Sequence, residues 1–202
     1  MILAIDTSTA ACTAALFDSA GRCISRRDEL IGRGHAERLA PMLSELLEGR
    51  EAKTILVGVG PGSFTGIRVG LAAAHGLAIG WDSALFGMSS LALLAASAIS
   101  TGEVAAAMTG GHGELFVQQF DSALCPTTDL LNLPPAQAAA AVSAEKVAGP
   151  GAQALVEARG RGEAILAWPA ACEALRLPEP LRSLRPVPVY ARAPDAKVRS
   201  VV

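Results

Sequence analysis

Apolar residues in the first half of the chain follow two spacings. Short, mostly apolar runs predict strands at Ile2–Ile5, Cys12–Phe17, Cys23–Arg27, Thr54–Val59 and Ala84–Gly87. Longer stretches, in which apolar residues recur every three or four positions, predict helices at His35–Leu47, Thr65–Ile79 and Ser89–Ile99. The predicted order is therefore three strands, a helix, a strand, a helix, a strand and a helix.

The second half of the chain repeats this order with weaker signals. Strands are predicted at Glu103–Met108, Glu114–Phe120, Leu124–Leu130, Lys146–Ala148 and Ala164–Trp168. Helices are predicted from Pro134 or Pro135 through the following alanines and at Ala152–Arg159. Two such lobes in tandem resemble the actin, sugar kinase and Hsp70 ATPase superfamily. We therefore predict an α/β actin-like fold with an N-terminal lobe at residues 1–101, a smaller C-terminal lobe at 102–190 and a tail at 191–202.

Small apolar residues dominate the composition of this 202-residue chain. Hydrophobic residues make up 51% of it and charged residues 18%, so part of its surface is predicted to contact a partner. A formal net charge of -2 argues against a free-standing nucleic-acid-binding protein, because binding would release few counterions. An excess of basic residues from Arg176 to Arg199 leaves two interpretations open, a solvated segment or a contact with RNA or an acidic partner.

The spacing of cysteines and histidines argues against a metal or redox site. No Cys-x-x-Cys pair occurs among the 4 cysteines, and no His-x-x-x-His pair among the 3 histidines would place two imidazoles on one helix face. The chain starts directly with a strand, without a secretory signal, and its longest apolar stretch, Val69–Trp81, is too short to span a bilayer. We therefore predict a cytoplasmic protein with reduced thiols, no metal and no membrane contact.

The most distinctive motif is Gly60–Arg68, which joins a predicted strand to a predicted helix. No Gly-Lys-Ser/Thr follows at the spacing of a phosphate-binding P-loop, and Ser63 does not lie in a Gly-x-Ser-x-Gly elbow. These two enzymatic interpretations are therefore excluded. Binding of an anion by backbone amides near Arg68 remains open.

Close helix packing explains more residues of this region. Gly66, Gly70 and Ala74 recur every four positions, which places small side chains on one helix face where another helix can approach. That neighbour is either the predicted helix His35–Leu47 of the same chain or a second subunit. The sequence leaves both alternatives open.

Four segments resemble the TsaB (YeaZ) family. They are ILAIDTST at residues 2–9, GHAERL at 34–39, GVGPGSFTGIR at 58–68 and YARAPD at 190–195. The resemblance implies a role in making threonylcarbamoyladenosine next to the anticodon of certain tRNAs. The sequence departs from the family pattern at Thr109–Gly113, where relatives usually have an Asp-Ala-Arg turn. It also departs at 171–190, which is short and rich in proline.

The resemblance also implies partners. Family members resemble the catalytic threonylcarbamoyltransferase subunit TsaD in fold, act as its dimerisation partner and are thought to lack catalysis of their own, and an ATPase, TsaE, joins the pair in bacteria. A non-catalytic subunit without cofactor is therefore implied, which forms a homodimer in isolation and meets tRNA through the complex. The predicted partner interface consists of His35, Arg38, Leu39, Met42, Leu46, Phe64, Gly66, Ile67, Gly70, Ala73, Ala74 and Leu77.

An enzyme is the alternative hypothesis. Asp6, Thr7 and Ser8 occupy the place where kinases of the superfamily contact phosphate and metal, and Gly110 and Gly111 offer a second glycine-rich turn. These residues predict a vestigial nucleotide site, or the active site of a small-molecule kinase or ATPase. In the simpler interpretation, Asp6 stabilises its own turn and the glycines form a hairpin loop.

Overall fold

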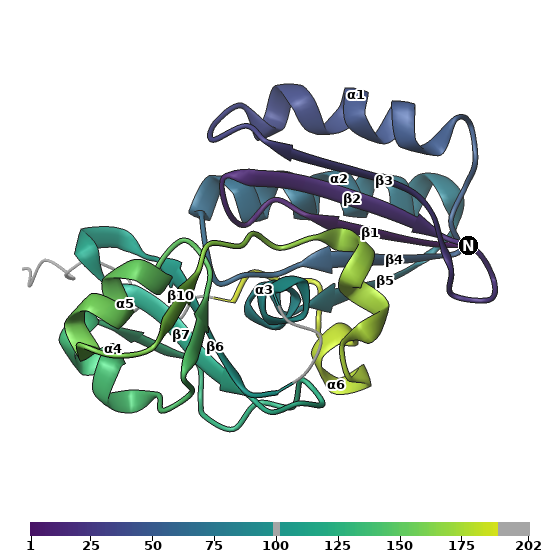
Figure 1. Cartoon of the computed structure of the whole chain (residues 1–202). Coiled ribbons are helices and arrows are strands. Elements are labelled where there is room, and N and C mark those ends of the chain that lie inside the picture. The colour runs from purple at the N-terminus through teal and green to yellow at the C-terminus, as the bar shows by residue number, and fades with distance from the viewer. Residues whose placement is uncertain (99–101, 190–202) are drawn as a thin grey trace, which may run out of the picture.

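The computed structural model describes residues 1–98 and 102–189, which are built around two mixed sheets (Figure 1). The first sheet has the strand order β3-β2-β1-β4-β5. β1 pairs antiparallel with β2 and parallel with β4, and β2 and β3 form the predicted hairpin. The strands are β1 Ile2–Asp6, β2 Ala11–Phe17, β3 Cys23–Leu30, β4 Thr54–Gly58 and β5 Ala84–Met88.

The second sheet has the matching order, β10-β9-β6-β7-β8. Its central strand β6 again pairs antiparallel with the next strand and parallel with β9. The strands are β6 Val104–Thr109, β7 Leu115–Phe120, β8 Leu131–Leu133, β9 Lys146–Ala148 and β10 Glu163–Ile165. This repeat confirms the predicted α/β actin-like fold class.

Helices cover the outer faces of both sheets, and one helix lies between them. Leu3 and Ile5 of β1 share a buried core with α1 and α2, whereas the intervening Ala4 shares a core with α3 and the second sheet. Figure 1 shows α3 between the two sheets. The helices are α1 His35–Leu47, α2 Phe64–Trp81, α3 Ser90–Ala98, α4 Pro135–Ala141 and α5 Ala152–Arg159.

The predicted strand Leu124–Leu130 is wrong, because the strand lies later, at Leu131–Leu133. The Asp121 carboxylate accepts hydrogen bonds from the backbone N–H groups of Ala123 and Cys125 at 2.9 and 2.8 Å. An aspartate that binds the following amides in this way closes a turn. The apolar residues after it therefore belong to a loop, which a count of apolar positions cannot detect.

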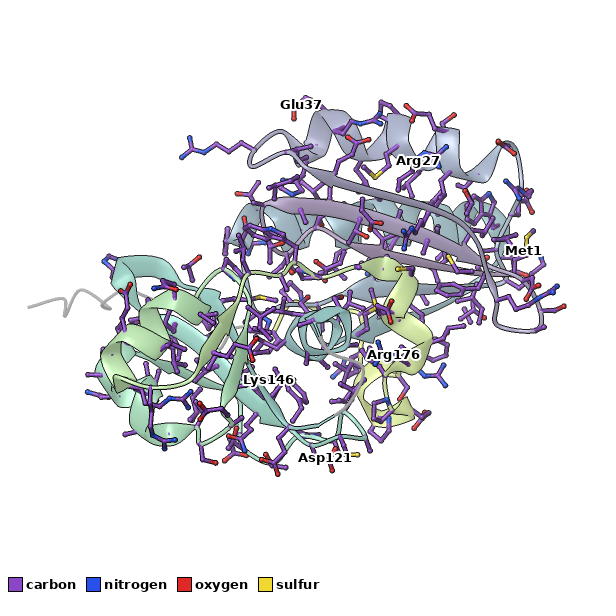
Figure 2. All side chains as sticks on the ribbon, viewed as in Figure 1. Met1, Arg27, Glu37, Asp121, Lys146 and Arg176 are labelled. Atoms are coloured by element: carbon purple, nitrogen blue, oxygen red, sulfur yellow. The ribbon has the colours of Figure 1, made fainter. Side chains whose placement is uncertain are left out.

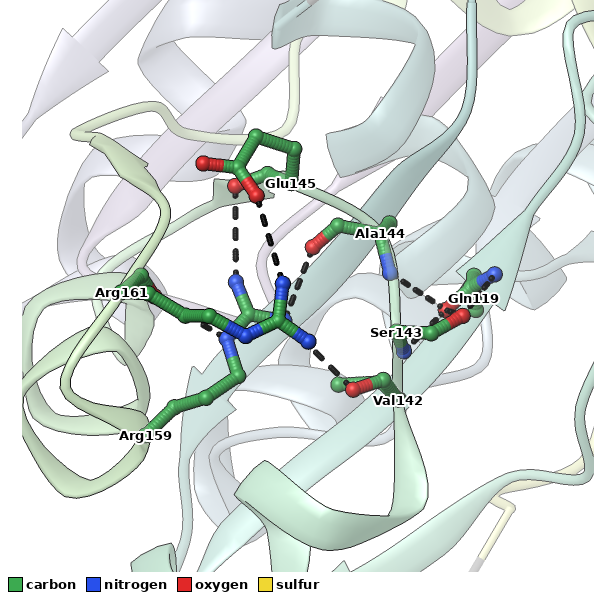
Figure 3. Close-up of polar contacts among 7 residues, drawn as sticks. All are labelled: Gln119, Val142, Ser143, Ala144, Glu145, Arg159 and Arg161. Atoms are coloured by element: carbon green, nitrogen blue, oxygen red, sulfur yellow. Dashed lines mark hydrogen bonds and ion pairs between the residues drawn. The ribbon is translucent and has the colours of Figure 1, made fainter.

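Polar side chains hold the connection between α4 and β9 from two sides (Figure 3). The side-chain oxygen of the buried Gln119 accepts hydrogen bonds from the N–H groups of Ser143 and Ala144, at 2.7 and 2.9 Å. From the other side, the Arg159 guanidinium donates to the carbonyl oxygens of Val142 and Ala144, at 3.4 and 2.9 Å. Backbone groups that neither sheet nor helix would satisfy are paired in this way.

After β10 the chain returns to the first sheet, and we call residues 170–189 the C-terminal strap. The strap contains the 3₁₀ helix η2 Ala171–Arg176, which contacts β2 and α3, and the short helix α6 Glu179–Arg182 beside β5. Arg176, labelled in Figure 2, donates a 2.6 Å hydrogen bond to the Ala96 carbonyl oxygen at the end of α3. Residues that the sequence assigns to the second lobe therefore pack on the first.

The boundary predicted near residue 101 stays a prediction, because residues 99–101 lie outside the described part of the chain. The same holds for the predicted tail at 191–202 and for the YARAPD segment. Among the residues that the structure describes, none of the helices combines the length and the apolar character needed to cross a bilayer.

Candidate functional site

The turn after β1 is organised by the buried carboxylate of Asp6. One carboxylate oxygen accepts hydrogen bonds from the backbone N–H and the hydroxyl of Ser8, at 2.8 and 2.7 Å, and the other accepts one from the Ser90 hydroxyl at 2.6 Å. Burial raises the pKa of Asp6, although these hydrogen bonds oppose the shift. Both oxygens are therefore already engaged by protein donors, and a nucleotide role for Asp6 stays a prediction.

Asp6 also connects the turn to the end of β4 and to the glycine-rich motif Gly60–Arg68 that follows it. A Cβ atom placed on Gly58 would lie 2.0 Å from a carboxylate oxygen of Asp6, so only glycine leaves room for this side chain. The Ser90 hydroxyl that donates to Asp6 also accepts a 3.2 Å hydrogen bond from the N–H of Gly60. The carboxylate thus links β1, the end of β4 and the start of α3.

The start of α2 is fixed by the same turn. The Ser63 hydroxyl caps the helix by accepting a hydrogen bond from the N–H of Gly66 at 3.2 Å. The Thr7 hydroxyl donates to the Gly66 carbonyl oxygen at 2.7 Å, and a Cβ atom on Gly66 would lie 2.0 Å from the Thr7 carbonyl oxygen. On Gly70, a Cβ atom would lie 2.5 Å from the Thr7 hydroxyl. These glycines allow α2 to approach the end of β1 closely.

These contacts favour the first of the two alternatives for the small-residue stripe, a place in the core of its own chain, in which α1 also takes part. The predicted partner interface itself stays a prediction. Gly66, Gly70 and Ala74 are buried inside the chain, against its own β1 turn and the first sheet. Many of the predicted interface residues are also buried in the core of the first lobe. Apolar residues at helical spacing mark the face of a helix that packs on the sheet. The buried members of that prediction are His35, Leu39, Met42, Leu46, Gly66, Ile67, Gly70 and Ala74.

The other predicted interface residues reach the surface to different degrees. Phe64 is exposed, whereas Arg38, Ala73 and Leu77 are partly buried. Arg38 donates hydrogen bonds to the carboxylates of Glu29 at 2.7 Å and Glu45 at 2.9 Å, which lower the pKa of both acids. It therefore joins α1 to the edge strand β3.

The exposed surface of α2 is largely apolar, and the predicted interface included only Phe64 of this face. Phe64 is 59% exposed and Ile79 84% exposed, and a Cβ atom on Gly76 or Gly80 would meet nothing within 4 Å. The Arg68 guanidinium lies 3.4 Å from the centre of the Phe64 ring, a cation–π contact. The signal was available, because residues 64–81 contain no Asp or Glu and have only Thr65, Arg68 and His75 among otherwise mostly apolar residues. We define the α2 outer face as Phe64, Arg68, Ala72, His75, Gly76, Ile79 and Gly80.

The glycine turn of the second lobe is closed by its own hydrogen bonds. The N–H of Gly110 donates to the Glu114 carbonyl oxygen at 2.7 Å, and Gly111 begins a single 3₁₀ turn. The Asn132 side chain donates to the Glu114 carboxylate at 2.6 Å. The Gly110 amide is therefore used within the turn, and a nucleotide role for Gly110 and Gly111 stays a prediction.

Two of the four cysteines lie close together without forming a disulfide. Cys23 and Cys172 line a shallow pocket of about 490 Å³ with Arg26 and Glu173, and burial raises the pKa of both thiols, which disfavours the reactive thiolate. Within residues 1–98 and 102–189, no three His, Cys, Asp or Glu side chains gather closely enough to hold a metal ion.

The repeated strand order and the buried carboxylate at the end of β1 define an actin-like α/β protein. A family model described as "TsaD: tRNA N6-adenosine threonylcarbamoyltransferase" matches residues 28–157. The chain is 35% identical over 127 residues to the tRNA threonylcarbamoyladenosine biosynthesis protein TsaB of Escherichia coli K12, an alignment that covers 59% of this chain and 54% of that protein. The chain belongs to the TsaB (YeaZ) family.

Solved structures agree over a longer stretch. YeaZ from Pseudomonas aeruginosa superimposes with a TM-score of 0.76 and 29% identity, over 94% of this chain and 98% of that one. A structure described as an uncharacterised protein with similarity to peptidase YEAZ from Pseudomonas aeruginosa superimposes with a TM-score of 0.80 and 32% identity, over 95% and 99%. The sequence match, by contrast, spans about half the length of the curated relatives.

Proposed function

We propose that this chain is a non-catalytic subunit in tRNA threonylcarbamoyladenosine biosynthesis, which binds and supports a TsaD-like threonylcarbamoyltransferase. Membership of the TsaB family and the names of its relatives support the pathway. The observation that carries the partner role is the exposed, apolar α2 outer face. A TsaE-like ATPase joins this pair in the cytoplasm, and tRNA is held mainly by the other subunits.

The α2 outer face has the chemistry of a helix-packing surface. A helix with so many apolar residues is normally buried, and here one side, which also carries Arg68 and His75, is open to solvent. Ala72, Gly76 and Gly80 lie at intervals of four residues, so a partner helix can approach the backbone of α2 closely. Ile79 and Phe64 then supply most of the apolar area that contact removes from water.

A partner of the same fold suits this face. The TsaD-type family model covers residues 28–157, which include α1 and α2, so a TsaD-like subunit presents an equivalent pair of helices. Two related pairs of helices, one from each subunit, can meet around an approximate two-fold axis. Two copies of this chain can meet in the same way when no TsaD-like subunit is present. The proposal therefore includes a weaker homodimer in isolation.

The non-catalytic role is supported by the state of the candidate nucleotide residues. The oxygens of Asp6 are occupied by Ser8 and Ser90, and the Gly110 amide is occupied by Glu114. Titration of the purified chain with ATP and Mg²⁺ in a calorimeter tests this part. No heat of binding is expected. A Kd below about 10 µM, in the lower part of the range of KM values that enzymes have for their substrates, would support the actin-like enzyme instead.

A matched pair of substitutions tests the partner surface. Ala72 lies on the α2 outer face and Ala158 on the exposed side of α5, so both Ala72→Arg and Ala158→Arg place a long cation on an exposed helix. Ala72→Arg is expected to weaken binding to the co-expressed TsaD-like subunit by about 100-fold or more, because it leaves a charge in an apolar interface. Ala158→Arg is expected to bind normally. Equal binding by both variants contradicts the proposed face.

A further inference from the structure

The last described residues of the strap lie next to the α2 outer face. The ring nitrogen Nε2 of His75, a member of that face, lies 3.3 Å from the carbonyl oxygen of Pro186. Beyond this contact, the strap exposes two apolar side chains, Val187 at 48% and Val189 at 36%. Apolar surface therefore continues from α2 onto a segment that the chain contributes more than a hundred residues later.

This part of the strap is held in place at both ends. Leu184 and Gly87 of β5 exchange two backbone hydrogen bonds, of 2.7 and 3.0 Å. The N–H of Val189 donates to the carbonyl oxygen of Val59 at 2.8 Å, beside the glycine-rich motif. Between these anchors the N–H of Val187 donates to the Arg185 carbonyl oxygen at 2.8 Å. The segment thus enters any complex already ordered.

Its composition suits contact with apolar side chains. Pro186 and Pro188 have no N–H and a fixed φ, which lowers the entropy lost on binding. The N–H groups of Leu184, Val187 and Val189 are used within the chain. The segment therefore presents the isopropyl groups of its valines to a partner. Few of its backbone N–H groups would lose a hydrogen bond to water on binding, a loss that costs free energy.

We propose that residues 184–189 form a second, rigid wall of the partner-binding surface, which the subunit seated on the α2 outer face contacts through Val187 and Val189. This inference rests on the proposed function. Packed helices lie about 8–10 Å apart, and a helix with its side chains is about 10 Å wide, so a helix seated over Ala72 and Gly76 reaches past His75 to the strap. The occupant is the TsaD-like subunit of the proposed function, because the strap continues the surface on which that subunit is proposed to sit.

Val187→Asp tests the wall, with Leu166→Asp as its control. Leu166 is an apolar residue that is 75% exposed just after β10, so its substitution places the same charge on an exposed apolar site elsewhere. Affinity for the TsaD-like protein of the same organism is measured by biolayer interferometry on the full chain. Val187→Asp is expected to raise the Kd at least about tenfold and Val189→Asp by a smaller factor, whereas Leu166→Asp leaves it unchanged.

The Ala72→Arg variant separates this inference from the proposed function. If Ala72→Arg loses binding while Val187→Asp and Val189→Asp both bind like the unaltered chain, the partner occupies α2 alone and the wall is refuted. If none of the three variants weakens binding, the α2 outer face and the wall are both refuted. Thermal unfolding of each variant accompanies the binding data, and unchanged unfolding temperatures assign a lost affinity to the surface.

Discussion

The two lobes share a strand order but differ in the helices that cover them. In the first lobe α1 has 13 residues and α2 has 18, whereas α4 has 7 and α5 has 8 in the second. Three strands of the second sheet have only 3 residues each. One topology thus supports a lobe with a long apolar helix face and a smaller lobe without one.

The lobes also differ in what brings their elements together. In the first, glycines let the α2 backbone touch the β1 turn directly. In the second, Gln119 and Arg159 hold the connection after α4 by hydrogen bonds. The contact between α2 and the β1 turn therefore depends on steric fit, and the connection after α4 depends on paired backbone groups. Four predictions probe this difference, from the largest expected effect to the smallest.

Gly66→Val is expected to prevent folding. Its Cβ atom would lie 2.0 Å from the Thr7 carbonyl oxygen, a backbone atom that cannot move without shifting β1, and we expect a loss of about 4 kcal/mol or more. Gly76→Val in the same helix is the control, because its Cβ atom meets nothing within 4 Å. Urea unfolding followed by circular dichroism distinguishes the two variants. Similar unfolding curves for both would refute the dependence of the α2–β1 contact on steric fit.

Gln119→Leu is expected to destabilise the second lobe by about 2–3 kcal/mol. The apolar replacement leaves the N–H groups of Ser143 and Ala144 without their acceptor. Arg161→Ala is the control, because the Arg161–Glu145 ion pair is long, at 3.6 Å, and well exposed, and is worth at most about 1 kcal/mol. Hydrogen exchange should show faster opening near residues 142–148 in Gln119→Leu. Protection equal to that of the unaltered chain would contradict this role.

Asp6 gives the first lobe a pH dependence of a defined sign. Burial raises the pKa of Asp6 in the folded state. At pH values between the ordinary carboxyl pKa and this raised value, the folded chain therefore holds a proton that the unfolded chain has released. The stability of the unaltered chain relative to Asp6→Asn is therefore expected to fall as pH rises from about 4, the ordinary carboxyl pKa, through the raised value. Urea unfolding over a pH series tests this, with the exposed Asp129→Asn as control. A relative stability that rises with pH would contradict it.

Helix ends provide the smallest effects. Asp82 after α2 has a φ of 50°, whereas the second lobe uses Gly160, with a φ of 72°, after α5. Asp82→Gly is expected to stabilise the chain by about 0.5–1 kcal/mol, and Gly160→Ala to destabilise it by a similar amount, because glycine adopts this left-handed conformation without strain. Differential scanning calorimetry measures both, and shifts of the same sign would show that cap strain does not control these ends.

Local patterns in the sequence predicted most elements, and the structure shows where such patterns stop. Apolar spacing located α1 and α2, and four sequence segments, one of them containing the glycine-rich motif, led to the correct family. The same spacing could not tell which face of α2 is buried, because Gly66 and Gly70 on one side resemble Gly76 and Gly80 on the other. Only the position of Thr7, which is distant in sequence, separates the two sides.

The strap lay beyond prediction for a related reason. Proline-rich residues after β10 carry little periodicity, and their place is set by contacts with the first sheet. The N–H of Ala171, for example, donates a 2.8 Å hydrogen bond to the hydroxyl of Thr13. No local propensity encodes a contact between residues so far apart, and it appears only once both sheets are assembled.

The return of the chain to the first sheet also has a consequence for biosynthesis. The hydrogen bond between Thr13 and Ala171 joins residues 158 positions apart. When the ribosome has finished β5, the residues that will cover this edge strand have not been made, and an uncovered edge can pair with other strands. The lobe that is translated first is therefore the lobe that is completed last, so the nascent chain must keep this edge from wrong partners until its final segment emerges.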